Sequence, residues 1–300
     1  MDKLLWMKCF VRVVETGSFS AVAREMNIGQ PNVSRHIASL EKELDTRLFY
    51  RSTRQVVPTQ EGQHYYAQAR QALDLIAQAE SEARGQHKPH GLLRLACSPA
   101  LAAEKIVGVL PDFMARYPDV DLDLRLSDSY IDLVAEGVDI AIRAGVLKDS
   151  ALRARRIGSS ERVFVASAGY LERHGAPGAP ADLLQHQCIL YTAISGAVAD
   201  WPFKDEQMQV TGRVRMNSLE GIRAAVLADM GIAYLPSWMV AEQLRSGAVR
   251  ALLKDHAGPL TPINAVYAAD RLLPQRAVVF IDYMEAVFAA APGLNGVTIA

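Results

Sequence analysis

The residues best suited to chemistry lie on one side of a short helical segment near the N-terminus. Between positions 30 and 44, four apolar residues recur at spacings of four, three and four: Val33, Ile37, Leu40 and Leu44. They form one stripe that must face other helices. The positions beside and opposite this stripe are Pro31, Asn32, Ser34, Arg35, Ser39 and Lys42. Because Arg can form two hydrogen bonds with guanine and Asn two with adenine, this set is typical of a helix that reads the DNA major groove.

Three basic residues near this helix are better placed for the phosphate backbone. Lys42, Arg51 and Arg54 would add affinity with little sequence preference. An ordinary solvated helix face is the alternative for any single helix. The whole arrangement around the segment favours DNA binding.

The elements that position this helix can be predicted from the surrounding residues. Apolar spacing predicts a helix over Leu4–Val14, and Gly17 ends it. Ser18 caps a second helix that runs to about Met26. Asn27-Ile28-Gly29 makes a tight turn, and Pro31 suits the first turn of the third helix because its missing N–H would be unpaired there anyway. The alternating stretch from Leu48 to Thr59 predicts a two-stranded wing.

A long alanine-rich helix without proline is predicted from Thr59 to about Gln86. Its small and apolar residues recur at spacings of four and three, as in a short coiled-coil seam: Tyr65, Ala69, Ala72, Ile76, Ala79 and Ala83. Packing on its own domain is the alternative. The position before a Gly, Pro and His break favours a linker that pairs two copies of the chain.

Beyond Gly91 the pattern alternates strands with helices. This predicts parallel sheets with helices on both faces. Expected strands include Leu92–Ala96, Asp121–Leu126, Asp139–Arg143, Val163–Ala166, Val210–Met216, Ile232–Leu235 and Ala265–Tyr267. Expected helices include Glu104–Tyr117, Tyr130–Glu136, Leu219–Asp229 and Arg276–Ala291.

Ligands of open α/β sheets bind beyond the carboxyl ends of strands. Three pairs or triplets of polar residues stand at such positions: Cys97-Ser98-Pro99, Ser127-Asp128 and Asn217-Ser218. A helix that starts after Ser98 could attract an anion at its N-terminus, whereas Asp128 disfavours a simple anion unless it points outward. The serines could instead serve only as helix caps.

Two further residues near these strand ends have more than one interpretation. Cys97 is either a small buried apolar residue or a redox sensor. Arg143 is expected to be structural, with ligand contact as the alternative.

Length, composition and charge distribution indicate the broad class of protein. The chain has 300 residues, half of them apolar, and a formal net charge of -1, so it can bury two or three cores. Residues 1–60 hold nine Lys and Arg against six Asp and Glu, which gives a basic head on an acidic body. Three scattered cysteines, and no signal peptide or membrane span, predict a cytoplasmic protein.

The two competing classes are an enzyme and an architectural DNA binder. The chain contains no GxxxxGK[ST], GxSxG or HExxH motif, and its seven histidines have no ligand spacing. We therefore expect no catalytic residue, no metal ligand and no cofactor other than a small-molecule effector. An architectural binder has no need of an acidic α/β body of about 200 residues.

Two parts of the sequence carry a resemblance to a known family. The stretch FVRVVETGSFSAVAREMNIGQPNVSRHIASLEKELDTRLFYRSTRQVVPTQEG resembles the winged helix-turn-helix of LysR-type transcriptional regulators without a gap. Later segments, including LVAEGVDIAIRAG and VLADMGIAYLP, resemble the rest of that family. The resemblance spans nearly the whole chain.

The resemblance implies an α/β protein with a winged helix-turn-helix (three helices plus a β wing), a linker helix and a two-lobed effector-binding domain similar to periplasmic solute-binding proteins. We expect the head at 1–58, the linker at 59–88, lobe I at 91–163 and 266–300, and lobe II at 164–265.

The resemblance also assigns residues and partners. DNA-contacting positions of the family correspond to Gln30, Pro31, Ser34 and Arg35, and Asn32 stands at a variable position that could set site preference. Effector-cleft positions correspond to Ser98, Ser127, Ser218 and Pro236. The implied partners are double-stranded DNA with an imperfect palindromic operator, a homodimer or homotetramer, a small-molecule effector and, as a further candidate, RNA polymerase. The effector, the operator, and activation or repression stay open.

Overall fold

The chain folds into two compact units. The computed structural model describes residues 2–50, 56–83, 88–129, 131–145, 152–192, 200–269, 272–291 and 293–295. The first unit contains Met1–Lys88 with Asp132–Val138, and the second contains Pro89–Ile131 with Asp139–Ala300. Within the described ranges, no helix combines the length and apolar character that crossing a bilayer needs.

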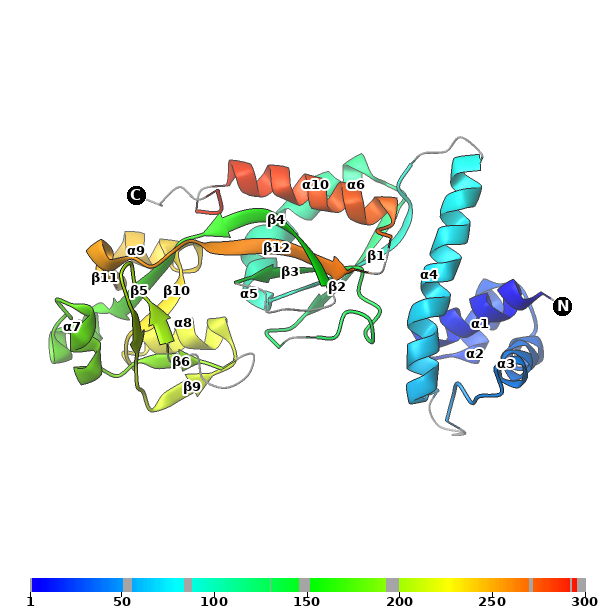
Figure 1. Ribbon diagram of the computed structural model, residues 1–300, viewed down its shortest axis with the longest axis horizontal. Helices are drawn as coiled ribbons and strands as arrows, with labels where there is room; N and C mark the ends of the chain where they lie inside the picture. The colour runs from blue at the N-terminus through cyan, green and yellow to red at the C-terminus, as the bar shows by residue number, and fades with distance from the viewer. Residues whose placement is uncertain are drawn as a thin grey trace. The chain divides into compact units, whose positions relative to one another are not determined.

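Four helices make up most of the first unit: α1 (Lys3–Thr16), α2 (Phe19–Glu25), α3 (Gln30–Leu44) and α4 (Gln60–Ala83) (Figure 1). The ends of α1, α2 and α3 lie within about two residues of the predicted ones, and the predicted end of the fourth helix near Gln86 lies outside the described residues. The Asp2 carboxylate accepts from the Leu5 N–H at 3.1 Å, and the Ser18 hydroxyl accepts from the Ala21 N–H at 3.2 Å. Gly17 ends α1 in the left-handed region with φ 63°, where glycine carries no steric penalty.

The core of this unit holds α1, α2 and α3 together with α4. Phe10, Val22, Val33 and Leu40 are fully buried in it. The ring of Phe10 lies 5.3 Å from that of Phe49 and 5.5 Å from that of Tyr65. Of the predicted wing the structure describes only the base, where Phe49 and Pro58 form an isolated antiparallel bridge, and residues 51–55 lie outside the described residues.

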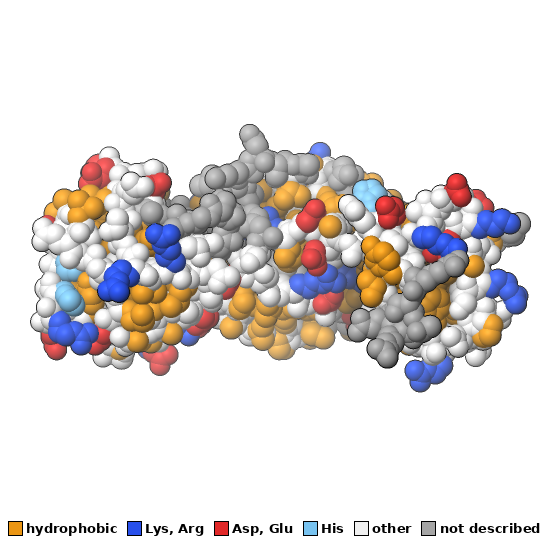
Figure 2. Space-filling view, turned by 90° about the horizontal axis from the view of Figure 1, so that it is seen from below, with side chains coloured by type: hydrophobic (Ala, Val, Ile, Leu, Met, Phe, Trp, Pro, Cys, Tyr) orange, Lys and Arg blue, Asp and Glu red, His pale blue; other side chains and the backbone are white. Residues whose placement is uncertain are grey.

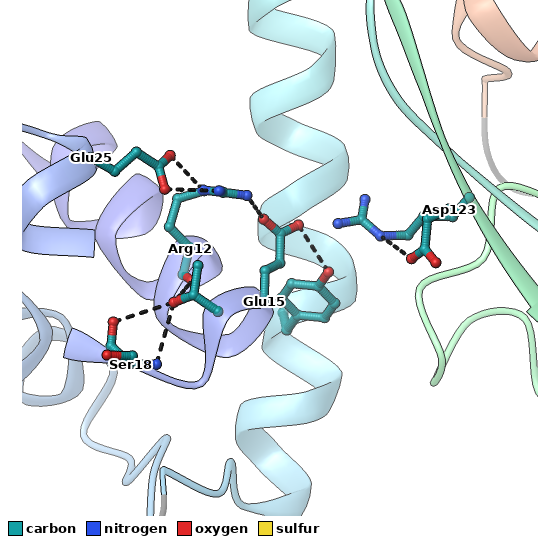
Figure 3. A network of polar contacts seen from close by, with 8 residues as sticks. Arg12, Glu15, Ser18, Glu25 and Asp123 are labelled. Atoms are coloured by element: carbon teal, nitrogen blue, oxygen red, sulfur yellow. Dashed lines mark hydrogen bonds and ion pairs between the residues drawn. The ribbon is translucent and has the colours of Figure 1, made fainter. Parts of the chain in front are cut away.

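A polar network links α1 to its neighbours (Figure 3). The Arg12 guanidinium donates to both carboxylate oxygens of Glu25, at 2.7 and 2.8 Å, and to Glu15. Glu15 in turn accepts from the Tyr66 hydroxyl of α4 at 3.1 Å. The hydrogen bond to Glu25, with a smaller contribution from Glu15, raises the pKa of Arg12, so this side chain keeps its charge.

The structure divides the predicted seam on α4 into two parts. Tyr65 and Ala69 pack into the core of their own unit, because the first half of α4 lies against α1. Ile76, Ala79 and Ala83 are exposed. The seam as predicted is therefore wrong for its first two residues, which the head uses for its own stability.

The second unit is built on a five-stranded sheet in the order β2-β1-β3-β12-β4. Its strands are β1 (Gly91–Cys97), β2 (Val120–Leu126), β3 (Ile140–Ala144), β4 (Leu152–Ser160) and β12 (Thr261–Ala268). β1 pairs in parallel with β2 and β3, whereas β12 is antiparallel to β3 and β4. The final helix, α10 (Gln275–Ala290), lies along β4 and β12 (Figure 1). Phe280 of α10 packs edge to face against Phe113 of α6 (Leu110–Arg116), with ring centroids 5.1 Å apart.

A second sheet in this unit has three strands in the order β10-β5-β11, namely β10 (Ala233–Pro236), β5 (Arg162–Ser167) and β11 (Val249–Leu252). All its pairings are antiparallel, so the expectation of parallel sheets is wrong here. Two separate two-stranded sheets accompany it: β6 (Ile189–Tyr191) pairs in parallel with β9 (Val214–Met216), and β7 (Asp200–Pro202) pairs antiparallel with β8 (Gln207–Gln209). The helices and short helical turns (η) of this region are α7 (Ala168–His174), η3 (Pro180–Gln185), α8 (Leu219–Leu227), η4 (Ser237–Met239), α9 (Ala241–Ser246) and η5 (Lys254–His256).

Three predicted elements of the second unit differ from the structure. The helix expected over 104–117 is broken into α5 (Pro99–Leu101), η1 (Ala102–Ile106), η2 (Val107–Val109) and α6 (Leu110–Arg116). The helix expected over 130–136 is a hydrogen-bonded turn in its described part. The strand expected over 210–216 is shortened to β9. Pro111, in the first turn of α6, explains the break between η2 and α6, since a proline cannot supply the N–H that continues a helix.

The chain returns from the second sheet to the first sheet earlier than expected. β12 begins at Thr261, so its first residues, which we assigned to the second lobe, pair in the first sheet. On the outward crossing, β4 ends at Ser160 and β5 begins at Arg162. Arg162 and Val163, which we assigned to lobe I, therefore pair with β10 in the second sheet. The rest of the predicted division into lobes stays a prediction.

Candidate nucleic-acid interface and ligand cleft

Helix α3 has one buried face and one exposed face. Val33, Ile37 and Leu40 are buried, and Leu44 packs at the edge of the same core. On the other side, the exposed residues are Gln30, Pro31, Asn32, Ser34, Arg35 and Lys42, with Ser39 half-buried. Every described residue that we assigned to DNA contact is thus accessible at least in part.

The turn before α3 fixes how this helix leaves the core. Asn27 adopts the left-handed conformation with φ 53°, which Asn tolerates better than most residues. The Ile28 N–H then donates to the Ala23 carbonyl at 3.0 Å. Gly29, the residue before α3, supplies no side-chain cap. The first turn of α3 therefore presents exposed side chains rather than free backbone donors, since Pro31 has no N–H and the Asn32 and Val33 N–H groups donate to the Gly29 carbonyl at 2.8 and 3.3 Å.

The other end of α3 holds the base of the wing. The Glu41 carboxylate accepts from the backbone N–H groups of Leu48, at 2.8 Å, and Phe49, at 3.3 Å. It also forms an ion pair with Arg47 at 3.0 Å. Our sequence reasoning missed Glu41, because an acidic residue on a basic surface gives no local sign of this role. The two basic wing residues, Arg51 and Arg54, lie outside the described residues.

Positive charge is exposed on this unit. Figure 2 shows Lys and Arg side chains at several places on the N-terminal unit. Neither Arg35 nor Lys42 forms an ion pair with a described residue. Both side chains are therefore available to a polyanion, and the surface has the chemistry of a DNA-binding face.

The second unit contains a cavity of about 160 Å³ lined by residues of both sheets. Four of the six predicted effector residues line it: Ser98, Ser127, Asp128 and Pro236. Pro99 and Ser218 are not among the lining residues, so direct contact by these two is not supported. The cavity thus lies where the strand-end argument placed it.

The serines have the local roles that we considered as alternatives, with one exception. Ser98 caps α5 by accepting from the Leu101 N–H at 3.4 Å, and Ser218 caps α8 by accepting from Gly221 at 3.5 Å. Ser127 caps no helix: its hydroxyl accepts from the Ser129 N–H two residues on, at 3.1 Å. Ser98 and Ser127 combine these bonds with exposure to the cavity.

Asp128 faces the cavity and does not point away from it. Burial raises the pKa of its carboxyl group, and a hydrogen bond from Ser218 opposes part of that effect.

Three arginines also line the cavity, and our sequence reasoning proposed none of them as its first choice. Arg125 lies 3.5 Å from the Asp123 carboxylate, and Arg143 donates to the Ile131 carbonyl at 2.9 Å. Arg162 donates to the Tyr234 carbonyl at 2.8 Å, and its guanidinium lies 4.7 Å from the centre of the Tyr234 ring. Arg143 thus has both the structural role we expected and the cavity position of the alternative.

Cys97 lines the same cavity but is chemically protected. Burial raises the pKa of its thiol to about 12. Since the thiolate is the reactive form, this environment opposes the redox-sensor interpretation.

Two regions of the chain match known families. Residues 4–63 match the family described as bacterial regulatory helix-turn-helix protein, lysR family, and residues 86–289 match the LysR substrate binding domain. The chain belongs to the LysR family. As a LysR-type protein, it is an effector-controlled, DNA-binding transcription regulator and not an enzyme.

Relatives of this LysR-type regulator match over almost their whole length. It is 36% identical over 280 residues to the HTH-type transcriptional regulator CrgA of Neisseria meningitidis serogroup C, covering 92% of this chain and 93% of that protein. It is 30% identical over 292 residues to the HTH-type transcriptional activator AaeR of Escherichia coli, covering 96% and 94%.

Solved structures support the same fold. The structure of CrgA from N. meningitidis superposes with a TM-score of 0.60 at 34% identity, covering 94% of this chain and 97% of that one. The full-length structure of AphB, the Vibrio cholerae virulence activator, gives a TM-score of 0.57 at 26% identity, covering 94% and 98%.

Proposed function

We propose that this LysR-type regulator reads an imperfect palindromic operator with α3 and binds its effector in the cavity of the second unit. The observation that carries the DNA-reading role is the two-sided geometry of α3. Its apolar stripe is buried, while Gln30, Ser34 and Arg35 are exposed at its N-terminal half. Asn32 adds a side chain that can distinguish adenine.

Two heads are needed to read a palindrome, and α4 offers a surface for pairing them. Ile76, Ala79 and Ala83 are exposed on its second half, and small residues at this spacing allow two helices to approach closely. We propose a dimer through this part of α4 and a tetramer as the complete assembly. Ile76→Glu should shift the mass measured by light scattering towards the monomer.

The effector acts by preferring one arrangement of the regulator over another, since a ligand with equal affinity for both would change nothing. Ser98 and Ser127 line the cavity from the first sheet, and Pro236 lines it from the second. RNA polymerase, in the cytoplasm, is the partner through which a bound regulator would act.

A footprinting experiment tests this proposal. The full-length protein is bound to the DNA flanking its own gene, with and without metabolite extracts, and cleavage protection is compared. We expect two protected half-sites one or more helical turns apart, with a pattern that an extract changes. Ser98→Phe and Ser127→Phe should keep the footprint and lose the response, while the control Ser246→Phe, which lies outside the cavity, should keep both. A normal response in both cleft variants would place the effector elsewhere.

A further inference from the structure

Three residues that we call the wing base, Arg47, Leu48 and Phe49, are held between α3 and the start of α4. Their N–H groups bond to α3, because the Glu41 carboxylate accepts from Leu48 at 2.8 Å and from Phe49 at 3.3 Å. Their carbonyl groups bond to the residue before α4. The Thr59 hydroxyl donates to the Arg47 carbonyl at 2.7 Å, and the Thr59 N–H donates to the Leu48 carbonyl at 3.0 Å. The wing base thus joins α3 to α4.

Thr59 is the centre of this joint. Its hydroxyl also accepts from the Gly62 N–H in the first turn of α4, at 2.9 Å, so one side chain binds both the wing base and the helix. Thr59 is 8% exposed and Leu48 is 1% exposed. Because a buried polar group that loses its partner is costly, these bonds hold the joint in one geometry. Gly62 allows the close fit, since a Cβ atom there would lie 2.1 Å from the Leu48 carbonyl oxygen.

Helix α4 is fixed to the same unit at a second place, one turn further along. The ring of Tyr65 lies 5.5 Å from that of Phe10 in the core. The Tyr66 hydroxyl donates to Glu15 of α1 at 3.1 Å, as part of the polar network in Figure 3. Attachment at two separate places opposes rotation of the helix about either one. The wing base and helices α1, α3 and α4 therefore form one rigid block.

A rigid block limits the DNA that two paired copies can read. When two copies pair through α4, the block fixes both the distance and the rotation between their α3 helices. Each base pair inserted between two half-sites moves them apart by about 3.4 Å and rotates them by about 35°. A rigid block cannot follow that change, whereas a loose joint between α3 and α4 would absorb it.

We propose that Glu41 and Thr59 are positioning residues that set the half-site spacing accepted by this regulator, because they hold the wing base between α3 and α4. This rests on the proposed function, which takes α3 as the reading helix and the second half of α4 as the surface that pairs two copies. Neither residue touches DNA in this role. Their substitution should therefore change the preferred spacing and leave the base preference of α3 intact.

Duplexes of altered spacing test the role of Thr59 in the full-length protein. The probes are the footprinted DNA flanking the gene, unchanged and with two base pairs inserted between the protected half-sites, and anisotropy gives the ratio of affinities. We expect the insertion to weaken binding at least about tenfold for the unchanged protein and less than about threefold for Thr59→Val. A substitution that only lowered the folded fraction would weaken both duplexes alike and leave the ratio unchanged. An equal ratio for the two proteins would overturn the proposal.

Four further variants assign the effect to the joint. Thr59→Ser keeps the hydroxyl and should restore the spacing dependence. Glu41→Gln keeps a side-chain oxygen for the two N–H groups and should retain it, whereas Glu41→Ala should lose it. Thr16→Val is the matched control, because the Thr16 hydroxyl also donates to a carbonyl, that of Arg12, at 2.8 Å and accepts from an N–H, that of Ser18, at 3.3 Å. It lies at the end of α1 and should keep the spacing dependence.

Two results with these variants would overturn the assignment. One is full spacing dependence in both Thr59→Val and Glu41→Ala. The other is its loss in Thr16→Val, which would show that any weakened hydroxyl contact in the unit has the same effect.

A measurement without DNA separates this proposal from the one on which it rests. The three cysteines are buried, so a spin label on Lys8→Cys, at an exposed position of α1, reports the distance between the labelled helices of two paired copies. We expect a narrow distribution of distances, and a broader one when Thr59→Val is added. Equal widths would overturn the rigid joint alone. The absence of any distance between copies would overturn the pairing, and this proposal with it.

Discussion

Pro236 and Arg162 lie opposite each other where β10 and β5 pair in antiparallel register. The last residue of one strand therefore stands beside the first residue of the other, and both line the cavity. This pairing puts the Arg162 guanidinium beside the carboxyl end of β10. A search limited to the carboxyl ends of strands finds only Pro236 there. It gives the second sheet both a cation and an apolar surface at the cleft.

Arg35→Ala should weaken binding to the operator by about 1–3 kcal/mol, the usual value for one two-pronged base contact, and should largely spare binding to unrelated DNA. Arg35 is exposed, so the fold should not change. The measurement is anisotropy with operator and scrambled duplexes. An unchanged affinity ratio would show that Arg35 reads no base.

Lys42→Ala is the matched comparison on the same helix. A phosphate contact adds affinity without sequence preference, so operator and scrambled duplexes should be weakened alike. The slope of log affinity against log salt concentration should become shallower by about one. If Lys42→Ala weakened binding to the operator but not to the scrambled duplex, Lys42 would instead be a residue that contacts bases.

Gly62→Ala should destabilise the N-terminal unit. A Cβ atom at Gly62 would lie 2.1 Å from the Leu48 carbonyl oxygen, which belongs to the backbone at the base of the wing. Relieving such a clash typically costs about 1–3 kcal/mol. Thermal unfolding should show a lower midpoint.

The control for this prediction is Gly108→Ala. A Cβ atom at helical Gly108 meets nothing within 4 Å, and alanine is favoured over glycine inside helices by roughly 0.5–1 kcal/mol. The midpoint should stay the same or rise. Equal effects of the two substitutions would contradict the close packing of α4 against the wing base.

Asp128→Asn should stabilise the second unit at neutral pH. Burial raises the pKa of Asp128 in the folded state, so the ionised form is disfavoured relative to the unfolded chain. The stability that this group contributes is present below the ordinary pKa of Asp, about 4, and is lost as the pH rises through the raised value. The gain from the substitution should therefore shrink as the pH falls, as melting curves at several pH values can show. A gain independent of pH would contradict this account.

The three cysteines should resist modification in the folded protein. Burial raises the pKa of Cys9, and it raises the pKa of Cys97 and Cys188 to about 12. Thiol titration at about pH 8.5, where free Cys is half ionised, should find almost no reactive thiol until denaturant is added. Rapid modification of Cys97 in the native protein would restore the redox-sensor interpretation.

The sequence was most informative where structure depends on neighbouring residues. Ser18 as a cap, the turn at Asn27 and the stripe on α3 are all local signals, and each is confirmed. Pairing over long distances leaves no such signal: the residues opposite β5 in its sheet lie between 68 and 88 positions away. For this reason the antiparallel second sheet, and with it Arg162, could not be placed from the sequence.

The sequence also could not decide between the two interpretations of the α4 stripe, pairing with another chain or packing on its own domain. Tyr65 and Ala69 have the spacing of a helix seam, yet the core of the first unit buries them. Whether a helical stripe faces its own domain or another chain depends on the elements packed beside it, and the periodicity is the same in both cases.

The most direct test of the account is the ratio of affinities for two duplexes. The full-length protein is titrated, at roughly 0.15 M salt, with DNA flanking its own gene and with a scrambled duplex of equal length and composition. The account predicts that the flanking DNA binds at least about a thousandfold more tightly. Equal affinity for both duplexes, changing only with salt, would contradict sequence reading by α3.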